Sequence, residues 1–440
     1  MALAAFGRAT FDLAAAAAVL QDSRQALEAL PVKVVGVSDL LTDPAAAAAF
    51  ARQATDAGAD LIVCQFTTFV DDRFVAATAL AGGPPLALWS LRESPPVGAR
   101  LSLNSLTGAN LAGSRLLRLR HPFRFAFGNP DEPELQARLG AITRAATQAR
   151  RLSRLVVLVL GDHPDGFTFS DPADGAVAAA RVVRLPLDDL FARARAVPEE
   201  EYAPLAAAAA RSVRGLDALP AEQVTRFAQA LAVVRDETAR VGAGAVAVRC
   251  WPEFFTQFGA AACSLVSALN DQGVAAACEG DVLGAITLDM LSALADGPAY
   301  LGDLAALDQE RDAAVFWHCG AGAYQLASPR TGAVAGRHPN RGLGFTLEFA
   351  LKPGVVTIAR LGEGPAGLRL LCGGGEALDA PQRFLGTAAT VRLAGSEPLQ
   401  ARVARLIEEG WEPHYALVYG DVQAAVRDVA ALAGIPFHAL

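Results

Sequence analysis

The sequence predicts an α/β protein built from two αβα domains with doubly wound parallel sheets, followed by a β-rich, barrel-like C-terminal domain. The chain has 440 residues, which is too long for one hydrophobic core. Short apolar runs alternate with segments of helical periodicity up to about residue 297, and this alternation is typical of parallel sheets. Beyond that point strand-like runs follow one another with little helix. We therefore place the domains at residues 1–150, 151–297 and 298–440.

In the first domain, Asp43-Pro44 is a typical helix start, a capping residue followed by proline at the first helical position. Apolar runs bounded by turn residues predict the strands, and apolar residues at helical spacing predict the helices. The predicted strands are residues 32–36, 59–66, 85–89, 116–119 and 123–127, and the helices are 11–30, 43–57, 73–80, one opening at 108–110, and 132–153.

The same patterns extend through the rest of the chain. In the second domain we predict strands at residues 154–161, 179–186, 245–250 and 274–278, and helices at 187–195, 204–214, 220–241 and 258–269. In the third we predict strands at 315–318, 345–349, 354–360, 368–371, 387–393, 415–419 and near 436, and helices at 398–410 and 422–433. Residues 362–367 indicate a hairpin, and Gly373-Gly374-Gly375 indicates a loop.

Composition excludes several classes of function. The net charge is −8 and the pI about 5.4, with no basic stripe, so nucleic acid is not an expected partner. No run of strongly apolar residues is long enough for a membrane span, and the N-terminal region lacks the basic start of a secretory signal. Six scattered cysteines without paired spacing indicate reduced thiols, so we expect a cytoplasmic protein.

Carboxylates follow two neighbouring strands of the second domain. Glu253 comes just after the strand at 245–250, while Glu279 and Asp281 follow the strand at 274–278. A helix between these strands makes them parallel, so their carboxyl ends meet at one sheet edge, where α/β proteins bind ligands. Like charges crowded there favour a divalent ion such as Mn²⁺ or Mg²⁺. The alternative is that each acid only caps the helix that follows it.

Histidine is scarce, with six in the chain, and three positions stand out. His414 precedes a strand, His318 ends one, and His338 lies in a polar loop. A lone histidine is more often a structural residue than a ligand. A metal shell that already contains carboxylates still needs a neutral ligand, and His414 or His318 could supply it.

Three short motifs resemble the L-fucose/L-arabinose isomerase superfamily, most closely the shorter fucose isomerase-like enzymes of bacteria. They are WPEF at 251–254, CEGD with the following GA at 278–285, and WHCG at 317–320. The resemblance implies two αβα domains with a β-rich C-terminal domain, and interconversion of aldoses and ketoses. It also implies Mn²⁺ as cofactor, with Co²⁺ or Mg²⁺ as alternatives, and a homo-oligomer.

The resemblance also assigns roles to residues. Its fucose branch would place the metal on Glu253, Asp281 and His414, and its arabinose branch would add Glu279 and His318 to the shell. We take Glu253 and Asp281 as the acid and base that move a proton between C1 and C2 of the sugar. The residues that we assign to substrate binding are Glu279, His318, Trp251, Arg92, Trp89 and His338.

The function that these features predict is a metal-dependent aldose–ketose isomerase that acts on a free monosaccharide or a derivative through an enediolate. A sugar epimerase or aldolase on the same fold, or a non-catalytic sugar-binding protein, is the alternative. In the resembling family the first domain of one subunit covers the active site of another. We therefore expect a trimer or hexamer in which residues 64–72 and 89–93 line a neighbouring pocket.

Overall fold

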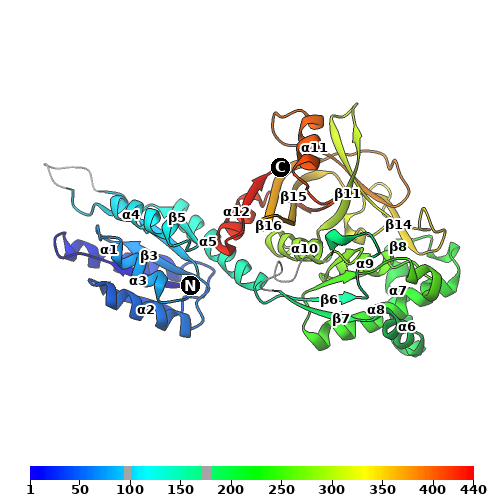
Figure 1. The fold of residues 1–440 in the computed structure, drawn as a ribbon, viewed down its shortest axis with the longest axis horizontal. Helices are drawn as coiled ribbons and strands as arrows, with labels where there is room; N and C mark the ends of the chain where they lie inside the picture. The colour runs from blue at the N-terminus through cyan, green and yellow to red at the C-terminus, as the bar shows by residue number, and fades with distance from the viewer. Residues whose placement is uncertain (94–100, 171–179) are drawn as a thin grey trace. The chain divides into compact units, whose positions relative to one another are not determined.

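A computed structural model describes residues 1–93, 101–170 and 180–440, which form two compact units. Unit 1 comprises Met1–Arg151 and Ala425–Ile435, and unit 2 comprises Leu152–Ala424 and Pro436–Leu440 (Figure 1). In this described part of the chain, no helix combines the length and the apolar character that crossing a membrane requires. The α/β class with a barrel-like C-terminal sheet is confirmed.

Unit 1 contains a five-stranded parallel sheet in the order β2-β1-β3-β4-β5. Its strands are β1 (Ala2–Phe6), β2 (Gly36–Leu41), β3 (Ile62–Phe66), β4 (Leu86–Ser90) and β5 (Phe123–Phe127). Its helices are α1 (Leu13–Glu28), α2 (Pro44–Asp56), α3 (Arg73–Leu80), α4 (Ser105–Arg118), α5 (Pro133–Leu152) and α12 (Gln423–Ala433). Helix α12 begins two residues before the second segment of this unit, Ala425–Ile435.

Both faces of this sheet are covered. On one face, α2, α3 and α4 pack their apolar residues against alternate residues of β3, including Cys64 and Phe66. On the other face, the buried Gln65 donates to Ser23 of α1 at 2.7 Å. The doubly wound architecture of the first domain is therefore present.

Two strand predictions in unit 1 were wrong, and one strand was missed. The first strand is Ala2–Phe6, which was not predicted, and the strand expected at 32–36 lies at Gly36–Leu41. Residues 116–118, expected in a strand, end α4. The C-terminal helix α12, predicted in the third domain, clusters with unit 1. There its buried Asp428 pairs with Arg124 and Arg138.

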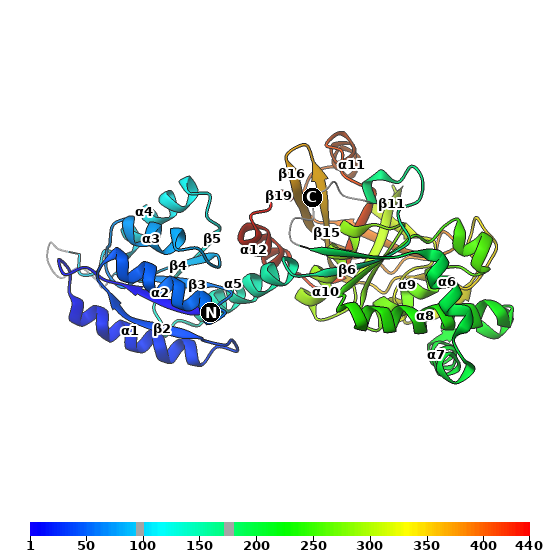
Figure 2. The same cartoon turned by 60° about the horizontal axis from the view of Figure 1, so that its bottom comes forward.

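Unit 2 begins with a four-stranded parallel sheet in the order β10-β9-β6-β7. Its strands are β6 (Val156–Leu160), β7 (Arg181–Leu185), β9 (Ala245–Val248) and β10 (Ala275–Cys278). Its helices include α6 (Leu187–Ala196), α7 (Glu199–Ser212), α8 (Ala221–Val241) and α9 (Cys263–Asp271) (Figure 1 and Figure 2).

The barrel is a ten-stranded sheet in the order β19-β16-β15-β18-β11-β12-β17-β14-β13-β8. Strand β16 also pairs with β17, which closes the six strands from β16 to β17 into a ring. The strands are β8 (Val213–Arg214), β11 (Tyr300–Asp308), β12 (Ala313–His318), β13 (Ala333–Gly336), β14 (Thr346–Ala350), β15 (Gly354–Gly364), β16 (Gly367–Ala377), β17 (Thr387–Leu393), β18 (His414–Tyr419) and β19 (Phe437–Ala439). Helix α11 (Leu399–Glu408) connects β17 to β18.

The helix α10 (Val282–Ala295), which the sequence patterns did not predict, joins the two parts of unit 2. It packs against β10 of the parallel sheet and against β15 and β18 of the barrel. Its residues Val282–Leu291 are all buried, as expected for a helix covered on every side. This position brings the end of β10 next to strands that come much later in the chain.

The glycine run Gly373-Gly374-Gly375 was predicted as a loop but lies inside strand β16. A Cβ atom at Gly373 would lie 2.6 Å from the Leu440 side chain, and one at Gly375 would lie 2.7 Å from the Arg392 backbone oxygen. Close approach of neighbouring chain, and not a turn, requires glycine here.

Candidate active site at the edge of the second sheet

The turn after β10 separates two carboxylates that are only two residues apart. Glu279 has φ 60° and Gly280 has φ 68°, both in the left-handed region. A Cβ at Gly280 would lie 2.8 Å from the Asp162 backbone oxygen, so only glycine fits. A glutamate with left-handed backbone angles is uncommon, and such backbone strain persists where the surrounding structure enforces it. The turn directs Glu279 and Asp281 to different nitrogen atoms of the His414 ring.

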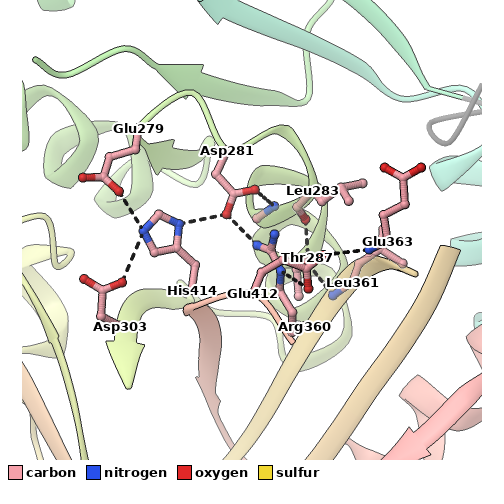
Figure 3. Close-up of polar contacts among 11 residues, drawn as sticks. Glu279, Asp281, Leu283, Thr287, Asp303, Arg360, Leu361, Glu363, Glu412 and His414 are labelled. Carbon is pink, nitrogen blue, oxygen red and sulfur yellow. Dashed lines mark hydrogen bonds and ion pairs between the residues drawn. The ribbon is translucent and has the colours of Figure 1, made fainter. Parts of the chain in front are cut away.

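Asp281 is completely buried, and both of its carboxylate oxygens are engaged. One oxygen, Oδ1, accepts the Gly284 N–H at 2.8 Å and caps α10. The other, Oδ2, accepts from Arg360 Nη1 at 2.5 Å and lies 2.9 Å from His414 Nδ1 (Figure 3). Burial alone would raise the pKa of Asp281, but Arg360 and His414 outweigh it and hold that pKa below its usual range.

His414 lies between Asp281 on one side and two further carboxylates on the other (Figure 3). Because Nδ1 donates to Asp281, Nε2 is directed toward Glu279 Oε2 at 3.2 Å and Asp303 Oδ1 at 3.5 Å. This Nε2 is buried, and among the described residues it has no partner with hydrogen-bond geometry. A carboxylate that fixes one imidazole nitrogen while the other faces a site is the usual support of a metal-binding histidine.

His318, at the end of β12, contributes a second buried imidazole. Its ring centroid lies 5.5 Å from that of His414. His318 Nδ1 accepts the Cys319 N–H at 2.9 Å, and Nε2 has no hydrogen-bond partner in the described part of the chain. One ligand atom each from Glu279, His318 and His414 lies within 4.8 Å of the others, and such a group could hold a metal ion.

A cavity of about 200 Å³ opens at this cluster. It is smaller than the pockets of about 300–1,000 Å³ that hold drug-sized ligands, which suits a small molecule such as a monosaccharide. Trp251 lines it and donates Nε1–H to Glu279 Oε1 at 3.2 Å. The described residues that line the cavity are Cys250, Trp251, Phe255, Cys263, Glu279, His318, Cys319, His338, Asn340 and Arg341.

Glu253, predicted as ligand and catalyst, is held elsewhere in this structure. Arg249 donates Nε–H and Nη2–H to its two carboxylate oxygens, each at 2.8 Å. These hydrogen bonds lower the pKa of Glu253, and Arg249 also donates to the His163 backbone oxygen. Glu253 is not among the described residues that line the cavity. The sequence patterns did not indicate its pairing with Arg249.

The remaining predicted residues divide between the units. Trp251 and His338 line the cavity of unit 2. Trp89 belongs to unit 1, where it is fully buried and donates to the Gly128 backbone oxygen at 2.9 Å, so its side chain has no face free for a sugar. Arg92, also in unit 1, is about half exposed and forms a bidentate ion pair with Glu132.

Sequence reasoning missed three residues of this site, Asp303, Arg360 and Arg341. Asp303 pairs across the sheet with His414, and Arg360 is a completely buried arginine in a strand. A charged residue within an otherwise apolar strand is the signal that could have indicated Arg360, because buried charges need a partner. Arg341 is indicated by no motif.

Comparison with known proteins reveals close relatives. The chain is 45% identical to the sulfoquinovose isomerase of Alkalicoccus urumqiensis over 402 residues, which is 90% of each chain. It is 40% identical to the sulfoquinovose isomerase of Priestia aryabhattai over 420 residues, 94% of this chain and 93% of the relative. It is 36% identical to that of Clostridium sp. (strain MSTE9) over 369 residues, 82% of each chain. This chain belongs to the sulfoquinovose isomerase family.

The family makes the protein an isomerase of the aldose–ketose type that acts on a sugar, so the non-catalytic alternative is set aside. No family model matches the chain. The resemblance to the L-fucose/L-arabinose isomerase superfamily therefore stays a prediction.

Proposed function

We propose that this protein is a metal-dependent isomerase that converts sulfoquinovose, an aldohexose with a sulfonate at C6, into the corresponding 2-ketose. The substrate follows from the names of the relatives. The observation that carries the metal site is the convergence of Glu279, His318 and His414 beside a cavity. The mechanism rests on the contacts of these residues.

The donor atoms fit a divalent transition ion. Two buried imidazole Nε2 atoms lack hydrogen-bond partners among the described residues, and a carboxylate lies beside them. Imidazole nitrogen favours Mn²⁺ or Co²⁺ over Mg²⁺, which prefers oxygen ligands and retains water. Such an ion, when bound, supplies a Lewis acid that polarises the sugar oxygens at C1 and C2.

The residues of this chain would fix the geometry of the reaction. Asp281, paired with Arg360, holds His414 in one tautomer and orientation. The Trp251 indole holds Glu279 and forms a wall of the cavity, and Phe167 packs edge-on against that indole at 5.3 Å. These rings exclude water from the carbon atoms that exchange the proton.

Isomerisation requires a base that takes a proton from C2 and an acid that returns one to C1. The two acids chosen from the sequence, Glu253 and Asp281, are engaged by arginine partners. We therefore assign the proton transfer to Glu279 and Asp303. Glu279 faces the cavity, and the side chain of Asp303 is 33% exposed with one oxygen 3.5 Å from His414 Nε2.

A chelation experiment tests the proposal. Protein stripped of metal should not convert sulfoquinovose, and Mn²⁺ or Co²⁺ should restore formation of the ketose, followed by NMR. L-fucose, L-arabinose and D-glucose in the same assay test the substrate. Full turnover by protein shown to be metal-free would reject the metal. Preference for a sugar without sulfonate would reject the substrate.

We also propose that the chain assembles into a trimer or hexamer in which the first unit of one subunit covers the site of another. The resemblance to the isomerase superfamily supports this, together with the half-exposed Arg92 side chain. Mixing inactive Glu279→Gln with inactive Arg92→Ala should restore part of the activity. No recovery in mixed oligomers would mean that each subunit builds its own site.

A further inference from the structure

The loop between β13 and β14 carries a group of hydrogen-bond donors that the isomerisation chemistry does not use. His338, Asn340 and Arg341 from this loop line the cavity. Its backbone is a closed turn, in which His338 N donates to the Leu343 oxygen at 2.8 Å and Gly342 N to the His338 oxygen at 2.9 Å. The following Gly344 N donates to the buried Gln223 side chain at 2.8 Å. The loop is therefore an ordered wall of the cavity, held by its own backbone hydrogen bonds and by Gln223.

Arg341 is the one guanidinium or ammonium group among the described residues that line the cavity. In that part of the chain, Arg249 and Arg360 near the site each hold a carboxylate, whereas no carboxylate lies within ion-pair distance of Arg341. Its guanidinium lies over the Trp251 ring, 5.8 Å from the centroid. Arg341 is an exposed residue, and its charge lies at the cavity with no carboxylate partner among the described residues.

His338 adds a neutral donor. Its Nδ1 accepts the Asn340 backbone N–H at 3.3 Å, so the ring proton lies on Nε2. The Phe255 ring packs edge-on against the imidazole at 4.9 Å and fixes its plane. Burial, together with the nearby His318 and Arg341, lowers the pKa of His338 to about 4, so the ring is neutral at pH 7. With the Asn340 amide, this loop presents a charged donor and two neutral donors.

The lining of the cavity therefore combines two chemistries. Glu279 and His318 of the candidate metal cluster line it, and the loop donors of His338, Asn340 and Arg341 are further lining groups. A sulfonate is a permanently anionic group with three acceptor oxygens and no donor. Planar guanidinium groups bind such oxyanions with two parallel hydrogen bonds.

We propose that Arg341, with His338 and Asn340, binds the C6 sulfonate of the substrate and makes the enzyme selective for sulfonated over neutral aldoses. This inference rests on the proposed function and names the residues that set its specificity. Arg341 acts on binding and not on the proton transfer, because C6 is remote from C1 and C2.

The test compares two sugars that differ only in the sulfonate, sulfoquinovose and 6-deoxyglucose. Arg341→Met removes the charge and keeps an apolar stem over Trp251. We expect kcat/KM for sulfoquinovose to fall about 10- to 100-fold, mainly through KM, with kcat/KM for 6-deoxyglucose unchanged. Arg341→Lys should recover part of the loss. An equal loss with both sugars, or no loss with either, overturns the assignment.

Arg337→Met is the matched control, because Arg337 is exposed on the same loop and is not among the cavity-lining residues. It should leave both kcat/KM values unchanged, and an effect as large as that of Arg341→Met would overturn the proposal. Thermal unfolding of each variant shows whether the fold is kept.

A binding measurement separates this proposal from the proposed function. Calorimetry with 2-hydroxyethanesulfonate needs no turnover. The wild-type chain should bind it, more weakly at high salt, and Arg341→Met should lose at least about tenfold in affinity. Binding lost in the variant would support the anion site even if no sugar is isomerised. Equal binding by both proteins would overturn the anion site and leave the isomerase proposal intact.

Discussion

Two strand-to-helix junctions, one in each unit, have the same kind of aspartate helix cap. They differ in the surroundings of the aspartate's second carboxylate oxygen. In unit 1, Asp43 follows β2 and accepts the Ala46 N–H at 2.9 Å at the start of α2. In unit 2, Asp281 follows β10 and accepts the Gly284 N–H at 2.8 Å at the start of α10. Asp43 is exposed, whereas Asp281 is completely buried and its second oxygen contacts Arg360 and His414.

This difference separates a structural cap from a site residue. Both aspartates satisfy the same helix N-terminus, so the capping interpretation of the sequence holds for each. Only Asp281 also pairs with a buried arginine and orients a buried histidine. A local pattern identifies the cap, and only the tertiary contact identifies the second role.

Asp281→Asn should produce the largest effect. Asparagine keeps the cap but removes the shorter of two ion pairs of the completely buried Arg360, which keeps only Glu412 at 3.6 Å among the described carboxylates. Removing one member of a buried ion pair costs about 3–5 kcal/mol, which chemical denaturation of unit 2 should show. Activity should be lost as well, because His414 loses its orienting carboxylate.

The matched change Asp43→Asn should alter the free energy of unfolding by less than about 0.5 kcal/mol, because asparagine caps as well as aspartate. Equal effects of the two variants would show that the contacts of Asp281 with Arg360 and His414 contribute nothing to the free energy of unfolding. The double variant Asp281→Asn with Arg360→Met should regain stability without regaining activity.

Glu279→Gln should leave the fold intact and lower kcat at least about 100-fold, because the amide neither binds the metal well nor accepts a proton. The carboxylate of Glu279 contacts Trp251 and His414 and is not part of a helix cap. Metal content measured by mass spectrometry should fall with the activity. Glu253→Gln is the informative contrast, since Glu253 pairs with Arg249. If Glu253→Gln is the more damaging change, the assignment from the sequence is right and ours is wrong.

The pH dependence of metal binding should reflect His414. Burial alone would lower the pKa of His414, but Asp281 and Glu279 raise it to about 10 in the metal-free chain. A raised pKa means that the proton stabilises the folded chain fully below the usual value of about 6.5 and that this stabilisation is lost as pH rises toward 10. A metal must displace this proton, so its affinity should rise about tenfold per pH unit between pH 7 and 9. Titration in two buffers of different ionisation heat measures the proton release, and no release would contradict the role of His414.

The sequence predicted the parts of the site that depend on local pattern. The strands β9 and β10 and their shared carboxyl edge follow from apolar runs separated by a helix. The contact between Asp281 and His414 spans 133 residues and depends on α10, which the patterns did not indicate. The pairing of Glu253 with Arg249 was equally hidden, because the relevant distance depends on the turn between them. Strand Ala2–Phe6 was missed because its small residues resemble a helix as much as a strand.

A small effect that is confined to unit 1 should come from Asp43→Ala. Loss of a helix cap costs about 1 kcal/mol, and the cost should appear in the unfolding transition of unit 1, which is a compact unit of its own. Metal content and kcat/KM should be unchanged, because the side-chain hydrogen bond of Asp43 within the described residues goes to the start of α2. Denaturation followed by circular dichroism, with activity measured on the same samples, checks both expectations. A clear fall in activity at unchanged metal content would show that the first unit takes part in the site, and would favour the shared-site assembly over a site built by unit 2 alone.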